Sequence, residues 1–482
     1  MTTPLAAGLL LALSGVEACA AAVALTWLRR GDRSLALFMA APAGLAFAAA
    51  LGALLVTGLL ALVLAWRLMR SRAGSLAVPL AVNLLSVALV AGLAEVAVRL
   101  GTVSTIQGPV FARTVLLPYQ WEDVAARGRA LLADVEAGRT YLVPDAELGW
   151  TIGASRRSTD YNRTGVEELL VQRGAPPPRR SAAADAAIYV SSVEGLRSPR
   201  PDLSFASVPA RRRIAVVGDS FTFGLEVTYD EAWPAQLERL LGDGVQVLNF
   251  GVDGYGVDQA YLRYRRDVEA WKPEIVVLGM IDDDVRRTMC VYAFLCFPGF
   301  GMPFGKPRLV ADARGLTPLN VPLPPPATLF AKRAITELPG LLFDGAYDPV
   351  EWEPHVYHHS YAIRFALSRY RPWSSRRPVV SDDTERVLNG EIARAFIRLA
   401  RERGARPIVV YFPSRRWPSS GTATPAREAL TAAHINFLDM TPCADTVPAD
   451  ARFVALHYSP ATNAAIARCL HAALTSAFES HD

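Results

Sequence analysis

Three long apolar stretches fill most of the first hundred residues, and they constrain the fold of this chain more than any other feature. Residues 5–28 carry one charged side chain, Glu17, and are long enough to cross a bilayer core of about 30 Å as a helix. Residues 35–66 are too few for two crossings and a turn, so one tilted or kinked helix is expected there. Residues 76–98 match a single crossing. The sequence therefore predicts about three transmembrane helices within residues 1–100.

Two classes of ligand are disfavoured by the sequence, namely nucleic acid and metal. Lys and Arg number 50 against 46 Asp and Glu, and the cluster Arg211–Arg213 has no interleaved aromatic side chains. His355, His358 and His359 lie in an irregular segment without carboxylates at ligand spacing, so a surface or packing role is favoured. We expect no nucleic-acid partner, no metal and no other cofactor.

The composition changes twice after the apolar region. Residues 101–210 are polar and contain a run of three prolines, which is typical of a linker. Short strands are expected within this linker, packed on the domain that follows. Residues 211–482 form that domain, and residues 290–373 interrupt it with many prolines and aromatic residues. This insertion is interpreted as a lid, a partner-docking surface or a purely structural excursion.

Short apolar runs rich in β-branched residues alternate with amphipathic segments after Arg213. This pattern predicts βαβ units, a parallel sheet and helices on both of its faces, hence an α/β domain of three layers. The expected strands are residues 214–217, 245–250, 275–278, 407–412 and 435–438. The expected helices are residues 233–241, 258–271, 383–404 and 460–478.

Four of the five cysteines fall in this domain: Cys290, Cys296, Cys443 and Cys469. Their even number allows two disulfides in an oxidising compartment, and free buried thiols are the alternative.

The segment from Ile214 to Gly224 contains the strongest candidate for chemistry. A strand leads into Gly218, which permits a sharp turn, and Ser220 then lies where the next helix begins. Free backbone N–H groups at a helix N-terminus stabilise developing negative charge, which suits a nucleophile. A helix N-cap without catalytic function is the alternative for Ser220.

The motif GDSFTFG at residues 218–224, followed by NFGVDGYG at residues 249–256, resembles the first two conserved blocks of the SGNH (GDSL-type) hydrolases. The similarity is greatest to the membrane-associated bacterial branch of that family. It extends from about Val143 to the C-terminus and is weak across the insertion. The resemblance implies a flavodoxin-like three-layer domain in which Ser220 attacks an ester carbonyl.

The same resemblance implies a histidine base near the C-terminus, and His457 occupies that place just before the last expected helix. The family has an aspartate two or three residues before this histidine, but Ala455 and Val454 stand there. Three aspartates further upstream, or a Ser–His dyad oriented by a backbone carbonyl, are the alternatives. Those aspartates are Asp439, Asp445 and Asp450.

In this family the oxyanion hole is formed by the serine N–H, a glycine N–H and an asparagine side chain. The resemblance assigns the two amides to Ser220 and Gly251, and Asp283 stands where the asparagine is expected. Asp283 therefore departs from the family pattern. An ionised carboxylate at this position would repel an oxyanion.

Two functions follow from these residues and this resemblance. The first is a membrane-anchored serine esterase or O-acyltransferase that acts on acylated envelope carbohydrate or a related ester. The second is a catalytically silent SGNH-like module that binds carbohydrate or a partner protein. The resemblance also implies a multi-pass protein of the inner cell membrane with an extracytoplasmic C-terminal domain.

Overall fold

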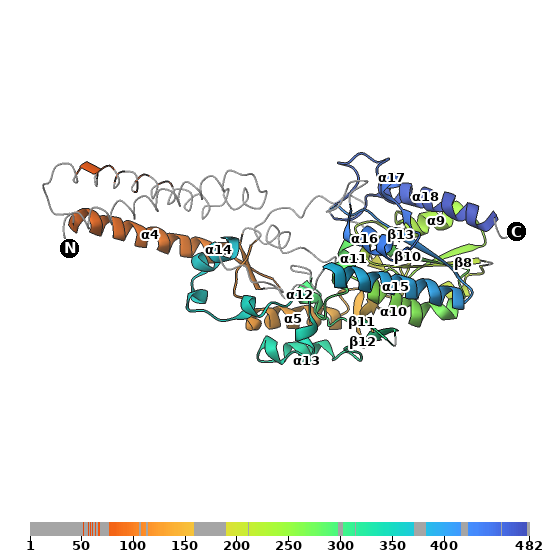
Figure 1. The fold of residues 1–482 in the computed structure, drawn as a ribbon, viewed down its shortest axis with the longest axis horizontal. Coiled ribbons are helices and arrows are strands. Elements are labelled where there is room, and N and C mark those ends of the chain that lie inside the picture. The colour runs from red at the N-terminus through yellow and green to blue at the C-terminus, as the bar shows by residue number, and fades with distance from the viewer. Residues whose placement is uncertain are drawn as a thin grey trace. The chain divides into compact units, whose positions relative to one another are not determined.

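The structure, a computed structural model, describes residues 77–479 and scattered positions between 52 and 67. The residues left out of the main range are 106–107, 112–113, 159–188, 211, 297–301, 314, 371–381, 416–422 and 455. The predicted span 5–28 and most of 35–66 therefore lie outside the described residues. The chain divides into two compact units (Figure 1). One comprises residues 1–124, 163–177 and 349–375, and the other the remainder.

The first unit is built around a long helix and a small antiparallel sheet. Helix α4 contributes Glu95, whose carboxylate accepts hydrogen bonds from the backbone N–H groups of Tyr361 and Ala362 at the start of α14. Among the described helices, none combines the length and the apolar character needed to cross a membrane. The elements of this unit are α4 (Ala77–Gly101), β1 (Val103–Thr105), β2 (Gly108–Phe111), β3 (Thr114–Val115) and α14 (Tyr361–Tyr370).

The second unit contains a sheet of five strands, all parallel, which confirms the predicted α/β class. Counted along the chain, the spatial order of the strands is 2-1-3-4-5, the flavodoxin-like doubly wound order. The order reverses between the first and third strands, and in such sheets ligands bind there, beyond the carboxyl ends. The strands are β8 (Arg212–Val217), β9 (Val245–Asn249), β10 (Ile275–Met280), β13 (Arg406–Tyr411) and β14 (Leu438–Asp439).

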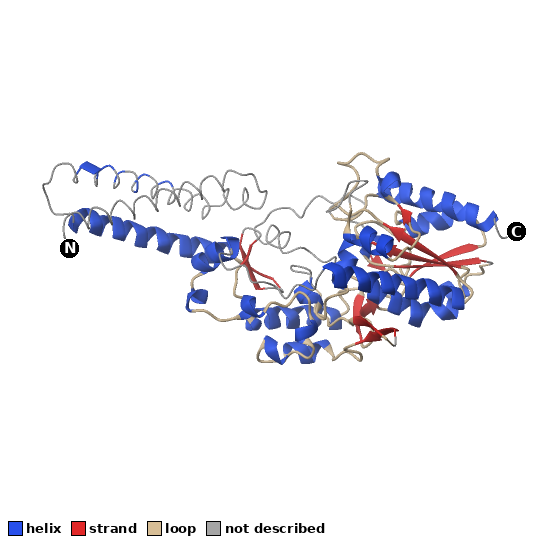
Figure 2. Ribbon diagram, in the orientation of Figure 1, coloured by secondary structure: helices blue, strands red, loops and turns tan. Residues whose placement is uncertain are grey.

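Helices cover both faces of this sheet (Figure 2). Alternate residues of β8 point to opposite faces, so Ile214 and Val216 join the core under α9 and α18, whereas Ala215 and Val217 join the core under α10 and α15. Burial on both faces explains why the strands read as continuous apolar runs. The covering helices are α9 (Trp233–Leu241), α18 (Pro460–Glu479), α10 (Val257–Arg263), α15 (Asp382–Glu402) and α16 (Pro425–Ala432).

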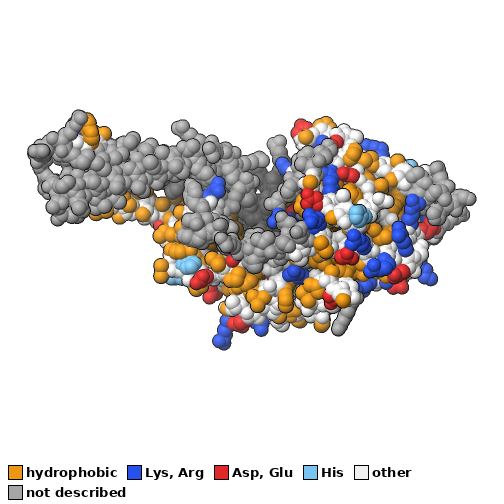
Figure 3. All heavy atoms as spheres, in the orientation of Figure 1, with side chains coloured by type: hydrophobic (Ala, Val, Ile, Leu, Met, Phe, Trp, Pro, Cys, Tyr) orange, Lys and Arg blue, Asp and Glu red, His pale blue; other side chains and the backbone are white. Residues whose placement is uncertain are grey.

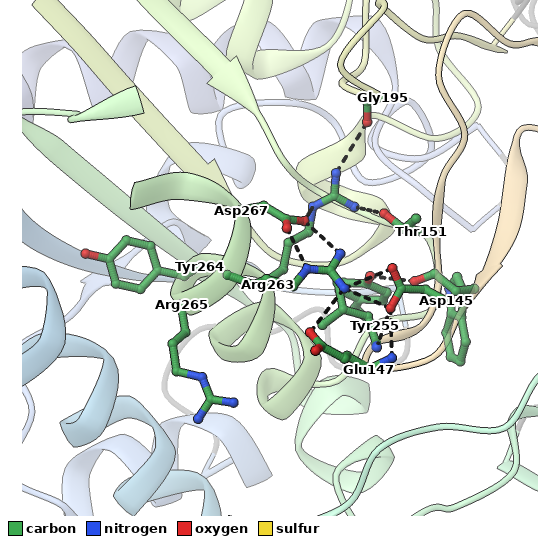
Figure 4. A network of polar contacts seen from close by, with 12 residues as sticks. Asp145, Glu147, Thr151, Gly195, Tyr255, Arg263, Tyr264, Arg265 and Asp267 are labelled. Carbon is green, nitrogen blue, oxygen red and sulfur yellow. Dashed lines mark hydrogen bonds and ion pairs between the residues drawn. The ribbon is translucent and has the colours of Figure 1, made fainter. Parts of the chain in front are cut away.

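The hairpin of β4 (Leu142–Asp145) and β5 (Gly149–Ile152) is attached to this α/β core by arginines (Figure 4). Arg263 donates hydrogen bonds to Thr151 Oγ1 at 2.7 Å and to the Gly195 carbonyl at 3.3 Å. Arg266 forms an ion pair with Asp145 at 2.8 Å. These bonds fix the segment before the first strand of the sheet onto the helix that follows the second strand.

Part of the predicted insertion lies in this unit as a short hairpin and two short helices. A fully buried ion pair between Lys306 and Asp258 attaches it to α10. Disulfides join Cys290 to Cys296 and Cys443 to Cys469, which decides between the two alternatives left open for these cysteines. The elements are α12 (Ala293–Cys296), β11 (Leu309–Asp312), β12 (Gly315–Pro318) and α13 (Pro326–Phe330).

The remaining elements are short, apart from one helix. Figure 3 shows basic and acidic side chains interspersed on the visible face of the second unit. The elements are α5 (Trp121–Glu136), β6 (Arg157–Ser158), β7 (Tyr189–Val190), α8 (Ser220–Phe223), α11 (Asp282–Arg287) and α17 (Thr441–Ala444).

Candidate active site

Ser220 lies beyond the carboxyl end of β8, the first strand of the sheet along the chain, as the first residue of α8, and is 2% exposed. The turn before it requires glycine, because a Cβ on Gly218 would lie 2.3 Å from Thr222 Oγ1 and 3.0 Å from the Gly279 carbonyl oxygen. Asp219 is the N-cap of α8 and accepts a hydrogen bond from the N–H of Phe221. The N-cap role considered as the alternative for Ser220 therefore belongs to its neighbour, and the Ser220 hydroxyl makes only a long hydrogen bond of 3.4 Å to Asp219 Oδ2. The hydroxyl also has a closer partner.

That partner is His457, in the loop before α18. Its Nε2 lies 2.8 Å from Ser220 Oγ. The following residue holds the loop in place, since Tyr458 donates a hydrogen bond of 2.6 Å to the Pro413 carbonyl beyond β13. The structure thus brings together the two residues expected to be nucleophile and base, although 237 positions separate them.

A third residue, Glu226, reaches the other ring nitrogen of His457. Glu226 Oε1 lies 3.1 Å from His457 Nδ1, at ion-pair distance but outside hydrogen-bond alignment. Such bonds are often poorly aligned in the absence of substrate. The same carboxylate accepts hydrogen bonds from the backbone N–H groups of Leu456 and His457. Glu226 therefore holds both the ring and the backbone of the histidine loop.

The electrostatic surroundings of His457 favour its protonated form. Burial on its own lowers the pKa of the imidazole, but the Glu226 carboxylate raises it, and Asp253 and Asp219 add to that effect. The net result is a pKa above the usual value. These surroundings stabilise the imidazolium that forms when His457 takes the serine proton.

The aspartates considered as alternative acids are engaged elsewhere. Asp439 forms an ion pair with Arg427, and Asp445 forms one with Arg452. Asp450 is exposed. Ala455, where the family has its acid, lies outside the described residues. The carboxylate that reaches His457 comes from the segment just after α8.

The oxyanion role predicted for Gly251 does not fit the structure. The N–H of Gly251 already donates to Asn249 Oδ1 at 2.9 Å, and a Cβ there would lie 2.5 Å from the Phe223 nitrogen. Gly251 is thus packed behind α8, away from the cavity. Gly254 lines the cavity instead, with φ at +76°. Its N–H and that of Ser220 donate to no acceptor among the described residues.

Asp283 also lines the cavity, and its neighbours form a charged network behind Ser220. Arg287 contacts Asp284 at 2.7 Å and Asp219 at 3.5 Å. Burial raises the pKa of Asp219, and burial together with the Asp219 charge raises the pKa of Asp284 well above its usual value. The asparagine expected at the position of Asp283 is thus replaced by a carboxylate, with one guanidinium close by.

A cavity of about 220 Å³ opens in front of Ser220. It combines Ser220 and His457 with an apolar wall and several polar side chains, which suits a small ester. The lining residues are Ser220, Phe221, Asp253, Gly254, Ile281, Asp283, Arg287, Met302, Ser414, Arg415, Leu456 and His457. No cluster of three or more metal-ligating side chains occurs among the described residues.

The sequence analysis missed Glu226, Gly254 and Ser414. One signal was available for Glu226, since a catalytic histidine without its usual acid requires another carboxylate and Glu226 follows the serine motif closely. For Gly254, a second glycine in the NFGVDGYG segment was an equal candidate. Ser414 follows an expected strand but carries no motif.

Comparisons with known proteins show similarity over part of the chain. No family model matches it. An acetylxylan esterase from Xylanibacter ruminicola is 36% identical over 90 residues, which are 16% of this chain and 19% of that protein. The match thus spans about a fifth of that relative's length.

The solved structures that match part of the chain have low sequence identity and low TM-scores. A G-D-S-L family protein from Desulfitobacterium hafniense is 15% identical and has a TM-score of 0.28, with 54% of this chain and 98% of that chain covered. An acetylxylan esterase from Geobacillus stearothermophilus is 14% identical and has a TM-score of 0.28, with 55% and 94% covered.

Proposed function

We propose that this protein is a serine esterase or O-acyltransferase that acts on an acylated carbohydrate. The observation that carries the proposal is the chain of contacts from Ser220 Oγ through the His457 ring to the Glu226 carboxylate. A nucleophile, a base and an orienting acid in this order define the serine-hydrolase arrangement, whatever their order in the sequence.

Each side chain has a defined task in the reaction. His457 Nε2 takes the hydroxyl proton as Ser220 Oγ bonds to the ester carbonyl carbon, and Glu226 stabilises the resulting imidazolium. The N–H groups of Ser220 and Gly254 face the carbonyl oxygen as it becomes negative. The imidazolium then protonates the departing alcohol. Water or a second hydroxyl attacks the acyl-serine while His457 takes its proton, and the imidazolium returns a proton to Ser220 Oγ as the acyl–oxygen bond breaks.

The carbohydrate substrate is supported by the partial match to an acetylxylan esterase. An extracytoplasmic location of the α/β domain is part of the proposal, because disulfides such as Cys443–Cys469 persist in oxidising compartments. Anchoring to the inner membrane by the apolar N-terminal stretches completes it and rests on the sequence.

A fluorophosphonate ester probe tests the activated serine directly. The wild-type protein is expected to be labelled, and Ser220→Ala and His457→Ala are expected to lose labelling because each removes one partner of the proton transfer. Acetyl-ester turnover is expected to fall in parallel. If the folded wild-type protein is neither labelled nor active, the esterase proposal is wrong. The alternative, a module that binds carbohydrate or a partner protein without turnover, then takes its place.

A further inference from the structure

One polar side chain in the cavity takes no part in the proposed chemistry. Ser414 follows β13 at its carboxyl end, is 4% exposed, and lines the same cavity as Ser220. Its Oγ is buried and has no hydrogen-bond partner among the described residues. A buried hydroxyl without a partner is unfavourable, and because this one lines the cavity it is available to a group of a bound molecule.

The position of Ser414 is fixed relative to the catalytic histidine. The carbonyl of the preceding residue, Pro413, accepts the 2.6 Å hydrogen bond from Tyr458, and Tyr458 directly follows His457. The ring of Tyr458 also packs against Phe221, with centroids 4.8 Å apart. The unpartnered hydroxyl of Ser414 therefore lies on a segment that is hydrogen-bonded to the loop carrying His457.

Asp283 supplies a second polar group to this cavity. An ionised carboxylate only accepts hydrogen bonds, so it cannot donate to an oxyanion as the expected asparagine would. It is, however, a strong acceptor for hydroxyl groups, because hydrogen bonds to charged groups exceed those between neutral groups. The replacement of asparagine by Asp283 thus changes the chemistry of this position from donation to acceptance.

Apolar side chains complete the cavity. Ile281, Met302 and Leu456 offer surfaces for an acyl group and for the C–H face of a sugar ring, and they contribute no hydrogen bonds. Hydroxyl groups of a bound molecule therefore find their partners among the polar lining side chains, which include Ser414 and Asp283. This division into apolar and polar walls matches an ester whose alcohol carries further hydroxyl groups.

We infer that Ser414 and Asp283 form a subsite for the free hydroxyl groups of the alcohol part of the ester, which makes the protein selective for acylated polyols such as saccharides. The inference rests on the proposed function and deepens it by naming the residues that recognise the alcohol part of the substrate. In the subsite, Asp283 accepts a hydrogen bond from one hydroxyl group, and the Ser414 hydroxyl donates to or accepts from a neighbouring hydroxyl group of the sugar.

A matched pair of substrates tests the selectivity. One is methyl 2-O-acetyl-β-D-xylopyranoside, and the other is the same ester with its two free hydroxyls converted to methyl ethers. The wild-type protein is expected to show a kcat/KM at least tenfold higher for the free-hydroxyl ester. In Ser414→Ala this preference is expected to fall about tenfold, as for one hydrogen bond, and Asp283→Ala is expected to reduce it by about ten- to a hundredfold.

Two controls separate recognition from folding. Ser198→Ala removes another buried serine hydroxyl, one that bonds the Arg200 carbonyl outside the cavity, and it is expected to leave the preference unchanged. The melting temperature of Ser414→Ala is expected to match or exceed that of the wild type, because the lost hydroxyl has no internal partner. A preference that survives in both Ser414→Ala and Asp283→Ala would overturn the inference.

Binding without turnover keeps the inference apart from the proposed function. Xylotriose is titrated into the Ser220→Ala protein by NMR, and into the same protein carrying Ser414→Ala. A weaker affinity in the second protein supports the subsite even where the wild type has no esterase activity. An equal affinity, or no binding to either protein, refutes the subsite even where the esterase activity is present.

Discussion

Replacing Glu226 by glutamine removes one negative charge from the candidate active site and keeps the shape of the side chain. The amide oxygen still accepts from the backbone N–H groups of Leu456 and His457, which the Glu226 carboxylate bonds at 3.1 and 3.2 Å. The protein is therefore expected to fold. What it loses is the charge beside His457 Nδ1, and with it the stabilisation of the imidazolium.

The size of the effect follows from the geometry. Two unit charges 3.1 Å apart interact by about 5 kcal/mol at an effective dielectric constant of about 20. Because about 1.36 kcal/mol corresponds to a factor of ten in rate, complete loss gives about a 10⁴-fold decrease. Asp219 and Asp253 continue to favour the charged ring. We therefore expect kcat for an acetyl ester to fall by about 10² to 10⁴-fold.

The pH profile is the assay that identifies the cause. Glu226 raises the pKa of His457, so its neutralisation is expected to move the acid limb of kcat/KM to lower pH while the maximum falls. Glu238→Gln, which neutralises another buried carboxylate, is the matched control and is expected to shift neither the limb nor the maximum. A decrease of less than tenfold with an unchanged limb would refute Glu226 as the orienting acid.

Glycine at the same position provides a second variant. Glu226 has φ of +67°, in the left-handed region that glycine adopts without strain. Glu226→Gly removes the carboxylate and relieves that strain, so activity is expected to fall at least as far as in Glu226→Gln without a comparable loss of stability. A variant that unfolds would show that the carboxylate is needed mainly for structure.

Three further predictions concern other parts of the molecule. The raised pKa of His457 places the acid limb of wild-type kcat/KM above about pH 6.5, because only the neutral ring accepts the serine proton; a limb at or below that pH would contradict the assignment. Replacing Cys443 and Cys469 by serine opens a loop of 26 residues and is expected to lower the free energy of unfolding by about 3.5 kcal/mol in denaturant titrations. Lys306→Met leaves the Asp258 carboxylate buried without its cation and is expected to lower the free energy of unfolding by about 3 to 5 kcal/mol. Combining Lys306→Met with Asp258→Leu is expected to restore most of that stability.

Much of the fold follows from short-range patterns in the sequence. A strand buried on both faces needs apolar side chains, as at residues 214–217 of β8, and the helices between such strands need one apolar side, so the order of elements can be predicted. The predicted helix 233–241 has the bounds of α9 in the structure. The last strand was predicted least well, because β14 is only Leu438–Asp439 and begins at the last residue of the predicted range 435–438.

The candidate nucleophile and base were predicted through the family resemblance, because the motifs that carry it depend on local surroundings. A glycine turn after a buried strand places Ser220 at the edge of the sheet, and His457 stands just before a helix that returns to the same edge. Sequence motifs record such local requirements. The same motifs did not distinguish Gly251 from Gly254, because which N–H is already bonded depends on how Asn249 folds back.

The sequence by itself thus determined the α/β class and the parallel sheet, and its resemblance to the SGNH hydrolases assigned Ser220 and His457. The tertiary structure alone decided the acid, since Glu226 meets a histidine loop 231 positions away in the chain. It also decided the disulfide pairing and the unpartnered hydroxyl of Ser414. The physical reason is that secondary structure and turns depend mainly on residues close in the sequence. Charge pairing and the satisfaction of hydrogen bonds depend on which distant segments pack together.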